Sequence, residues 1–122
     1  MRQLARVFKA LSDETRLRIL NLLIERECCV CEVMQALDIS QTRASRNLSI
    51  LNNSGFVKAK RSGMWVLYSI DAENVPEQYP LLMDTLKKSL ENNDEANNDK
   101  KRLKKAKRTV LNGVCAQAQS CN

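Results

Sequence analysis

Apolar residues recur at intervals of three and four through the first half of the chain, the spacing that places them on one face of an α-helix. This pattern predicts a first helix whose apolar positions are Leu4, Val7, Phe8 and Leu11. We expect Ser12 to be the N-cap of a second helix, because Asp13 and Glu14 would place carboxylates in its first turn. The apolar face of that helix comprises Leu17, Leu20, Leu23 and Ile24.

Two further short helices are expected on either side of a tight turn. The first runs from about Val30 to Leu37, and the second runs from Gln41 to about Asn53 with Ser40 as its N-cap. Two short helices joined by about three residues predict a helix-turn-helix.

The helix from Gln41 carries the side chains expected to bind DNA. Ala44, Leu48 and Leu51 share its apolar face, which leaves an opposite face without a carboxylate. Amides, hydroxyls and guanidinium groups are the types that bind base edges and phosphates. An ordinary solvated face usually mixes both signs of charge, so DNA binding is favoured. The candidate residues of this segment are Ser40, Gln41, Thr42, Arg43, Ser45, Arg46 and Asn47.

Alternating residues after Ser54 and Gly55 predict a β-hairpin with strands at 56–61 and 65–70. Lys60 and Arg61 are expected near the tip of this wing, where they would reach phosphates beside the groove that the preceding helix occupies. Charged residues on an edge strand also discourage aggregation. Their position next to the DNA-binding helix favours the DNA role. The fold class is therefore mainly α with a small β-hairpin, a winged helix-turn-helix that we expect to be dimeric.

The chain has two separate basic regions, but its net charge of +6 comes from the second one, because residues 1–99 together sum to −1. Residues 40–70 contain five basic and no acidic residues, and seven of the nine residues 100–108 are basic. We expect residues 1–92 to form the DNA-binding and dimerisation domain. Residues 93–122 are polar and blocky in charge, which favours a mobile linker and a basic, cysteine-containing tail. The tail's charge suits either non-specific phosphate contact or pairing with the acidic stretch 71–99.

A second apolar stripe follows Pro76 on an otherwise acidic segment. Pairing with a second copy and packing within the monomer both account for such a stripe. DNA-reading helices commonly come in symmetric pairs about 34–36 Å apart, which favours a homodimer. The candidate dimerisation residues are Leu4, Phe8, Tyr79, Leu82, Met83, Leu86 and Leu90.

The cysteines are Cys28, Cys29, Cys31, Cys115 and Cys121, and the chain contains no histidine. We expect a cytoplasmic protein without a membrane partner, since no apolar leader or membrane span is recognisable. Clustered thiols in a reducing compartment more often bind metal or react with oxidants than form disulfides. Zinc prefers four ligands, whereas As(III) and Sb(III) need only two or three sulfurs. The alternative is that the three clustered cysteines are small buried hydrophobic residues.

Cys29 and Cys31 are expected to be reactive, because a helix N-terminus lowers the pKa of a thiol. On a regular helix, residues i and i+2 point about 200° apart. Binding of one ion by both thiols would therefore unwind the third helix and displace the DNA-binding helix packed against it.

Three stretches together resemble the ArsR/SmtB family of winged helix-turn-helix repressors that respond to metals and metalloids. These are FKALSDETRLRIL (8–20), ECCVCEVMQALDISQTRASRNLSILNNSGFV (27–57) and RSGMWVLYSI (61–70). The Cys29-Val30-Cys31 motif is similar to that of arsenic- and antimony-sensing members. Those members often have a third cysteine where this chain has Met34. The resemblance implies that two thiolates suffice, or that Cys28, or Cys115 or Cys121 from the tail, supplies a third.

The favoured function is thus a homodimeric repressor that leaves operator DNA when As(III) or Sb(III) binds its thiolates. A thiol redox or persulfide sensor of the same fold is the alternative, and a Cd or Pb sensor is compatible with the same sulfurs. An enzyme is disfavoured, since there is no histidine base and no Gly-rich cofactor loop, and no organic cofactor is expected.

Overall fold

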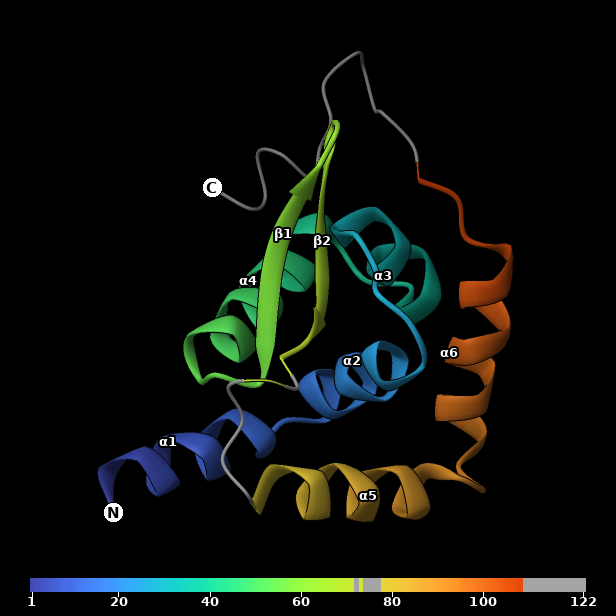
Figure 1. The fold of residues 1–122 in the computed structure, drawn as a ribbon. Coiled ribbons are helices and arrows are strands. Elements are labelled where there is room, and N and C mark those ends of the chain that lie inside the picture. Colours follow the sequence, from blue (N-terminus) through green and yellow to red (C-terminus); the bar gives the residue numbers. More distant parts are fainter. Residues whose placement is uncertain (72, 74–77, 109–122) are drawn as a thin grey trace.

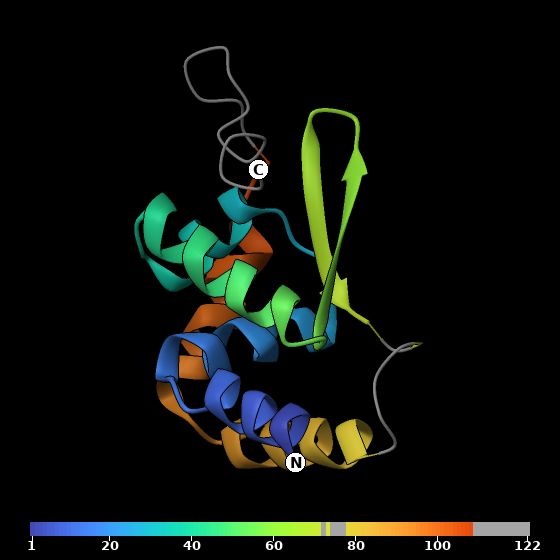
Figure 2. The same cartoon turned by 90° about the vertical axis from the view of Figure 1, so that its left-hand side faces the viewer.

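A computed structural model describes residues 1–71, 73 and 78–108 of the 122-residue chain. In this part a body of six helices carries a two-stranded antiparallel hairpin that projects beside α4 (Figures 1 and 2). None of the described helices is long and apolar enough to cross a membrane. The elements are α1 (Arg2–Leu11), α2 (Glu14–Glu25), α3 (Val30–Leu37), α4 (Gln41–Asn53), β1 (Val57–Ser62), β2 (Trp65–Ile70), α5 (Gln78–Leu90) and α6 (Asp94–Lys105).

Side-chain caps fix the starts of α2 and α4. The Asp13 carboxylate accepts the Arg16 N–H at 3.0 Å, so Asp13 is the N-cap of α2. The expectation that Ser12 fills this role was wrong, because its hydroxyl turns back to the Lys9 carbonyl at the end of α1. Ser40 caps α4 as expected, since its hydroxyl accepts a backbone N–H from the first turn at 3.1 Å.

The main hydrophobic core lies where α2, α3 and α4 meet the base of the hairpin. The inward positions expected for α4, Ala44, Leu48 and Leu51, are confirmed as fully buried. Between α3 and α4 the chain turns at Asp38, whose φ of 55° is left-handed, a conformation that aspartate tolerates better than most residues. The largest fully buried side chains are Phe56, Ile19, Leu20, Leu22, Leu48 and Leu51.

The two faces of the hairpin pack against different hydrophobic clusters. Its register pairs Val57 with Ile70 and Ser62 with Trp65, and β1 begins and ends one residue later than the strand predicted at 56–61. In β2, Val66 and Tyr68 belong to the main core, whereas Leu67 belongs to a separate small cluster against which Trp65 packs. This division follows from the alternation of side chains along a strand.

Helix α5 lies under the body, and its apolar stripe faces inward. Tyr79 is buried and stacks on Phe56, with ring centroids 4.4 Å apart, and Leu86 is also buried. Packing within the monomer therefore accounts for these two candidate dimerisation residues. Leu82, Met83 and Leu90 are half-buried against the same core.

Residues 94–105 form helix α6 instead of the mobile linker expected from their composition. Asn93 caps the helix by accepting the Ala96 N–H at 2.9 Å. Asp99 is fully buried, and Arg18 of α2 donates to both of its carboxylate oxygens at 2.7 and 2.8 Å. With Ala96 and Leu103 it forms an inward stripe that holds α6 on α2 and α3. Residues 109–122, including Cys115 and Cys121, lie outside the described part of the chain.

Candidate nucleic-acid interface and thiol site

The start of α4 presents a polar, cationic face. Ser40, Thr42, Arg43 and Arg46 are exposed, and Gln41 and Ser45 are half-buried, so this list covers six of the seven α4 candidates. A hollow of about 460 Å³ lies at this face, between α4 and the first turn of α2. No acidic residue occurs from 40 to 70, so within that stretch nothing offsets the positive charge. Side chains of these types bind phosphates and base edges.

The exception is Asn47, which the structure assigns to the packing of α2 on α4. It is only 7% exposed, and its amide oxygen accepts a hydrogen bond from Arg16 at 3.0 Å. Its amide nitrogen donates to the Arg43 carbonyl at 2.9 Å. Arg16 also donates to the Ala10 carbonyl at 2.6 Å and so joins three helices. The expectation that Asn47 is exposed for DNA contact was therefore wrong.

The hairpin extends the cationic surface as a wing. Lys58, Lys60 and Arg61 are exposed on β1. In the register Lys60 lies opposite Leu67 and Arg61 opposite Val66, which places both near the Gly63 turn that closes the hairpin. The hairpin that carries them projects from the body beside α4 (Figure 2).

The three clustered cysteines are buried but divide between two clusters. Cys28 pairs with Tyr68 through reciprocal main-chain hydrogen bonds of 3.0 and 2.7 Å and packs in the main core. Cys29 and Cys31 share the small cluster with Leu67. The structure thus brings Cys29 and Cys31 together and leaves Cys28 apart from them. Among the described residues no group of three or more His, Cys, Asp or Glu is arranged to hold a metal ion.

Cys29 lies before the first residue of α3, and this changes the expected geometry. As N-cap it has an extended backbone, with φ −90° and ψ 169°. The rule that i and i+2 point in opposite directions applies only inside a regular helix. The argument from helix geometry that both thiols reach one ion only by unwinding α3 therefore does not apply, because Cys29 lies outside the helix.

The environment of Cys29 also reverses the expected direction of its pKa shift. Burial raises the pKa of the Cys29 thiol to about 12, and the neighbouring Glu32 carboxylate contributes in the same direction. The loss of water outweighs the favourable helix N-terminus. Burial likewise raises the pKa of Cys28 to about 12. Both thiols are consequently protonated at neutral pH.

A C-terminal strap, residues 106–108, crosses the thiol cluster. The Gln35 side chain accepts the Lys107 N–H at 3.1 Å and donates to the Lys107 carbonyl at 2.7 Å. The Cys31 sulfur lies 3.2 Å from the Gln35 amide nitrogen and 3.7 Å from the Lys107 carbonyl oxygen. The strap therefore contacts a candidate ligand directly, a feature that the sequence analysis missed.

Glu32 fastens the strap to the start of α3. Its buried carboxylate accepts the Cys29 N–H at 3.0 Å, Arg108 at 2.9 Å and Arg26 at 2.8 Å. Burial alone would raise the pKa of Glu32, but these hydrogen bonds hold it below its usual range. The sequence signal was an acidic residue three positions after the N-cap, the spacing of a capping box.

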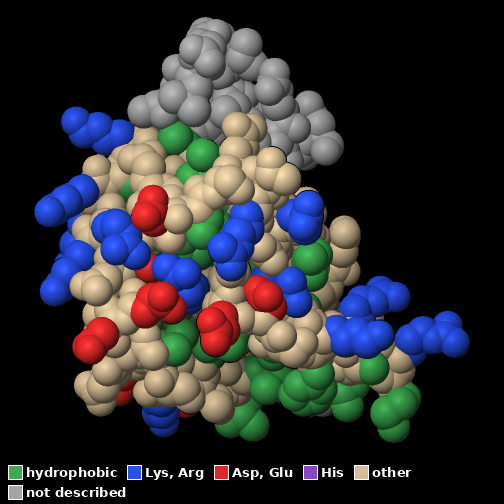
Figure 3. Space-filling model, turned by 180° about the vertical axis from the view of Figure 1, so that it is seen from behind, with side chains coloured by type: hydrophobic (Ala, Val, Ile, Leu, Met, Phe, Trp, Pro, Cys, Tyr) green, Lys and Arg blue, Asp and Glu red, His purple; other side chains and the backbone are tan. Residues whose placement is uncertain are grey.

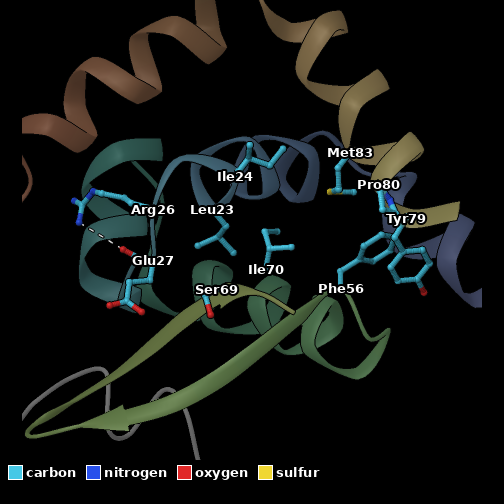
Figure 4. Close-up of a pocket in the computed structure, with 10 residues that line it drawn as sticks. All are labelled: Leu23, Ile24, Arg26, Glu27, Phe56, Ser69, Ile70, Tyr79, Pro80 and Met83. Atoms are coloured by element: carbon cyan, nitrogen blue, oxygen red, sulfur yellow. Dashed lines mark hydrogen bonds between the residues drawn. The ribbon is translucent and has the colours of Figure 1, made fainter. Parts of the chain in front are cut away.

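A separate pocket of about 420 Å³ lies between the end of α2, the base of β2 and the start of α5 (Figure 4). Most of its lining is apolar, with Arg26 and Glu27 at one end. Its one sulfur is the Met83 thioether, which does not form a thiolate. This pocket therefore contains no thiol that could bind a metalloid. The lining residues are Leu23, Ile24, Arg26, Glu27, Phe56, Ser69, Ile70, Tyr79, Pro80 and Met83.

A helix-turn-helix followed by a cationic β-wing defines a winged helix-turn-helix DNA-binding protein. The family model described as "Bacterial regulatory protein, arsR family" matches residues 13–59. The arsenic resistance transcriptional regulator ArsR2 of Pseudomonas putida is 43% identical over 81 residues, which cover 66% of this chain and 70% of that protein. The chain belongs to the arsR family of bacterial transcriptional regulators, which are not enzymes.

Two other proteins extend the comparison. The cadmium resistance transcriptional regulatory protein CadC homolog of Staphylococcus aureus is 45% identical over 74 residues, 60% of this chain. The match spans only 61% of that protein's length. The homodimeric winged helix-turn-helix domain Mb0332 of Mycobacterium bovis is 34% identical, with a TM-score of 0.62 over 75% of this chain and 82% of that one.

Proposed function

We propose that this chain is a homodimeric repressor that binds operator DNA and releases it when As(III) or Sb(III) binds Cys29 and Cys31. The observation that carries the proposal is the position of these two thiols. They share one buried cluster at the N-terminus of α3, the first helix of the helix-turn-helix. Relatives named as arsenic and cadmium resistance regulators support a thiophilic inducer.

Operator binding is assigned to the exposed polar face of α4 and to the wing. Thr42, Arg43 and Arg46 lie where a recognition helix meets base edges. Lys60 and Arg61 on the wing contact the adjacent phosphates. The first group supplies sequence preference, and the second supplies affinity that depends on salt.

Removing both wing charges, in the variant Lys60→Ala/Arg61→Ala, should weaken binding to all DNA sequences alike. The slope of log affinity against log salt should become shallower by about two, since each lost phosphate contact removes about one unit. Fluorescence anisotropy with a labelled operator at several salt concentrations measures this slope. The control is Lys101→Ala/Lys104→Ala on α6, which lies across the molecule from α4 (Figure 1). An unchanged slope in the wing variant would exclude phosphate contact there.

The chemistry of the thiol cluster favours a neutral trivalent hydroxide over a divalent cation. Arsenous acid, As(OH)₃, is uncharged and enters a buried site at a lower desolvation cost than a bare cation. Two As–O bonds are replaced by two As–S bonds, and each thiol proton leaves with a hydroxide as water. Arsenic remains trivalent, and no oxidant is needed. Zinc would require four ligands, more than the described residues gather here.

Binding of an ion by Cys29 and Cys31 would affect α4 through its packing against α3. The two helices are adjacent in the helix-turn-helix and pack on each other. A change in the backbone around Cys29 therefore shifts the base of α4. An allosteric coupling of about 1–3 kcal/mol would weaken operator binding about 5–150-fold.

The variant Cys29→Ser/Cys31→Ser should keep operator affinity and lose the response to arsenite. The unmodified protein should release a labelled operator during an arsenite titration, with affinity falling about 5–150-fold. Anisotropy titrations with arsenite, cadmium, zinc and peroxide compare the inducers on both proteins. Cys28→Ala and Cys115→Ser/Cys121→Ser are matched controls that should still respond. Arsenite release by the double serine variant would remove the assignment, and release by peroxide alone would favour the redox sensor.

A further inference from the structure

The indole of Trp65 has a buried nitrogen that lacks a hydrogen-bond acceptor among the described residues. A buried donor without a partner is uncommon in folded proteins and calls for a physical reason. No other buried side-chain nitrogen or oxygen in the described part of the chain is left in this state. A partner that arrives with a ligand would satisfy it.

The hairpin register places Trp65 against the small cluster that contains the two thiols. The Cys28–Tyr68 bridge lays the chain that leads into α3 along β2. Because strand side chains alternate, Trp65 and Leu67 share the face of β2 turned away from the main core. Leu67 is in the same cluster as Cys29 and Cys31, and Trp65 packs against this cluster.

We propose that the Trp65 indole N–H completes the metalloid site by hydrogen bonding to the oxygen left on arsenic or antimony after Cys29 and Cys31 have bound. This inference rests on the proposed function. Arsenous acid has three hydroxyl groups, and the two thiols displace two of them as water. The third stays on arsenic and accepts the indole hydrogen bond. An indole N–H is a donor only, so it holds this oxygen without acting as a ligand to the ion.

The residues around the thiol cluster are compatible with an oxygen as the third ligand of arsenic or antimony. Met34, which stands where the family resemblance implies a third cysteine, packs against the main core and not against the thiol cluster. The positive end of the N–H dipole also disfavours a bare divalent cation at this point. Trp65 is therefore a specificity-determining residue that favours trivalent hydroxides.

Trp65 is the single tryptophan of the chain, so its fluorescence reports on this site alone. Arsenite added to the unmodified protein should change the intensity and emission maximum in a saturable way. The same titration of Cys29→Ser/Cys31→Ser should give no change. Protection of the thiols from alkylation measures arsenite binding independently of fluorescence.

The variant Trp65→Phe keeps an aromatic ring and removes the N–H. Its arsenite affinity, measured by thiol protection, should fall about 3- to 10-fold, the change expected for one lost hydrogen bond. Phenylarsine oxide is the matched probe, because it loses its oxygen as water on binding two thiols and retains none to accept the bond. Its affinity should therefore stay within about twofold, since no hydrogen bond is lost.

The two arsenicals and the fluorescence titration distinguish a hydrogen bond from simple packing. Equal losses for both arsenicals would show that Trp65 only packs against the site and would overturn the assigned hydrogen bond. Thiol protection by arsenite without a fluorescence change would overturn it as well, while leaving the proposed function intact. Failure of arsenite to protect the thiols of the unmodified protein would overturn the inference together with the proposed function. If Trp65→Phe does not fold, the fluorescence of the unmodified protein still decides.

Discussion

Replacing Asp99 with alanine should lower the free energy of unfolding by about 3–5 kcal/mol, the cost of breaking a buried ion pair. The Asp99 side chain is 1% exposed, and its partner Arg18 is 16% exposed. Without the carboxylate, the Arg18 guanidinium keeps its charge but loses two hydrogen bonds of 2.7 and 2.8 Å. Either α6 detaches so that Arg18 regains water, or the charge stays buried without its partner.

Urea denaturation followed by circular dichroism measures the loss, and hydrogen exchange shows whether α6 opens separately. Glu95→Gln is the control, because Glu95 also faces Arg18 but is 63% exposed and 3.7 Å away. An exposed pair of this kind contributes little, so the control should change stability by less than about 1 kcal/mol. A loss no larger in Asp99→Ala than in Glu95→Gln would show that α6 is not held by this pair.

The variant Leu81→Glu should convert the proposed homodimer to monomers and reduce operator affinity by about 10²–10⁴-fold, because two linked DNA-binding units become independent. Leu4, Phe8 and Leu81 are 48%, 53% and 70% exposed, unusually open for large apolar side chains. Apolar side chains gather along the lower edge of the molecule, over α1 and α5 (Figure 3). A carboxylate buried between two copies at this surface would lack a partner.

Sedimentation equilibrium measures the mass, and anisotropy measures operator binding. Met64→Glu is the control for mass, since Met64 is 49% exposed on the wing and away from this surface. Urea denaturation of the Leu81→Glu monomer should show a folded chain, because Leu81 is exposed. A variant that remains dimeric would place the interface elsewhere.

The helix-turn-helix and wing could be predicted because their burial follows from local periodicity. Ala44, Leu48 and Leu51 lie on one face of α4 whatever surrounds it. Helix α6 could not be predicted in this way, because its inward stripe is centred on Asp99. Besides the local partner Arg102, that carboxylate pairs with Arg18, which is 81 residues away in the sequence, and no local pattern records this second contact.

For the candidate thiol site, the chemistry could be predicted from the sequence but the geometry could not. The soft character of Cys29 and Cys31 follows from residue type, so this candidate site could be proposed from the sequence alone. Its geometry depends on Cys29 being an N-cap and on burial under the strap, which only the fold determines. The burial of Asn47 could not be predicted from the sequence either. A polar residue next to an apolar face packs inward when a hydrogen-bond partner such as Arg16 is present.

The alternation of side chains along β2 separates two kinds of position on one strand. Val66 and Tyr68 support the fold from one face, while Trp65 and Leu67 meet the thiols from the other. Substitutions at Trp65 or Leu67 therefore alter side chains that lie outside the main core. If the proposed site is correct, one strand would let ligand preference change while the residues that support the fold stay the same.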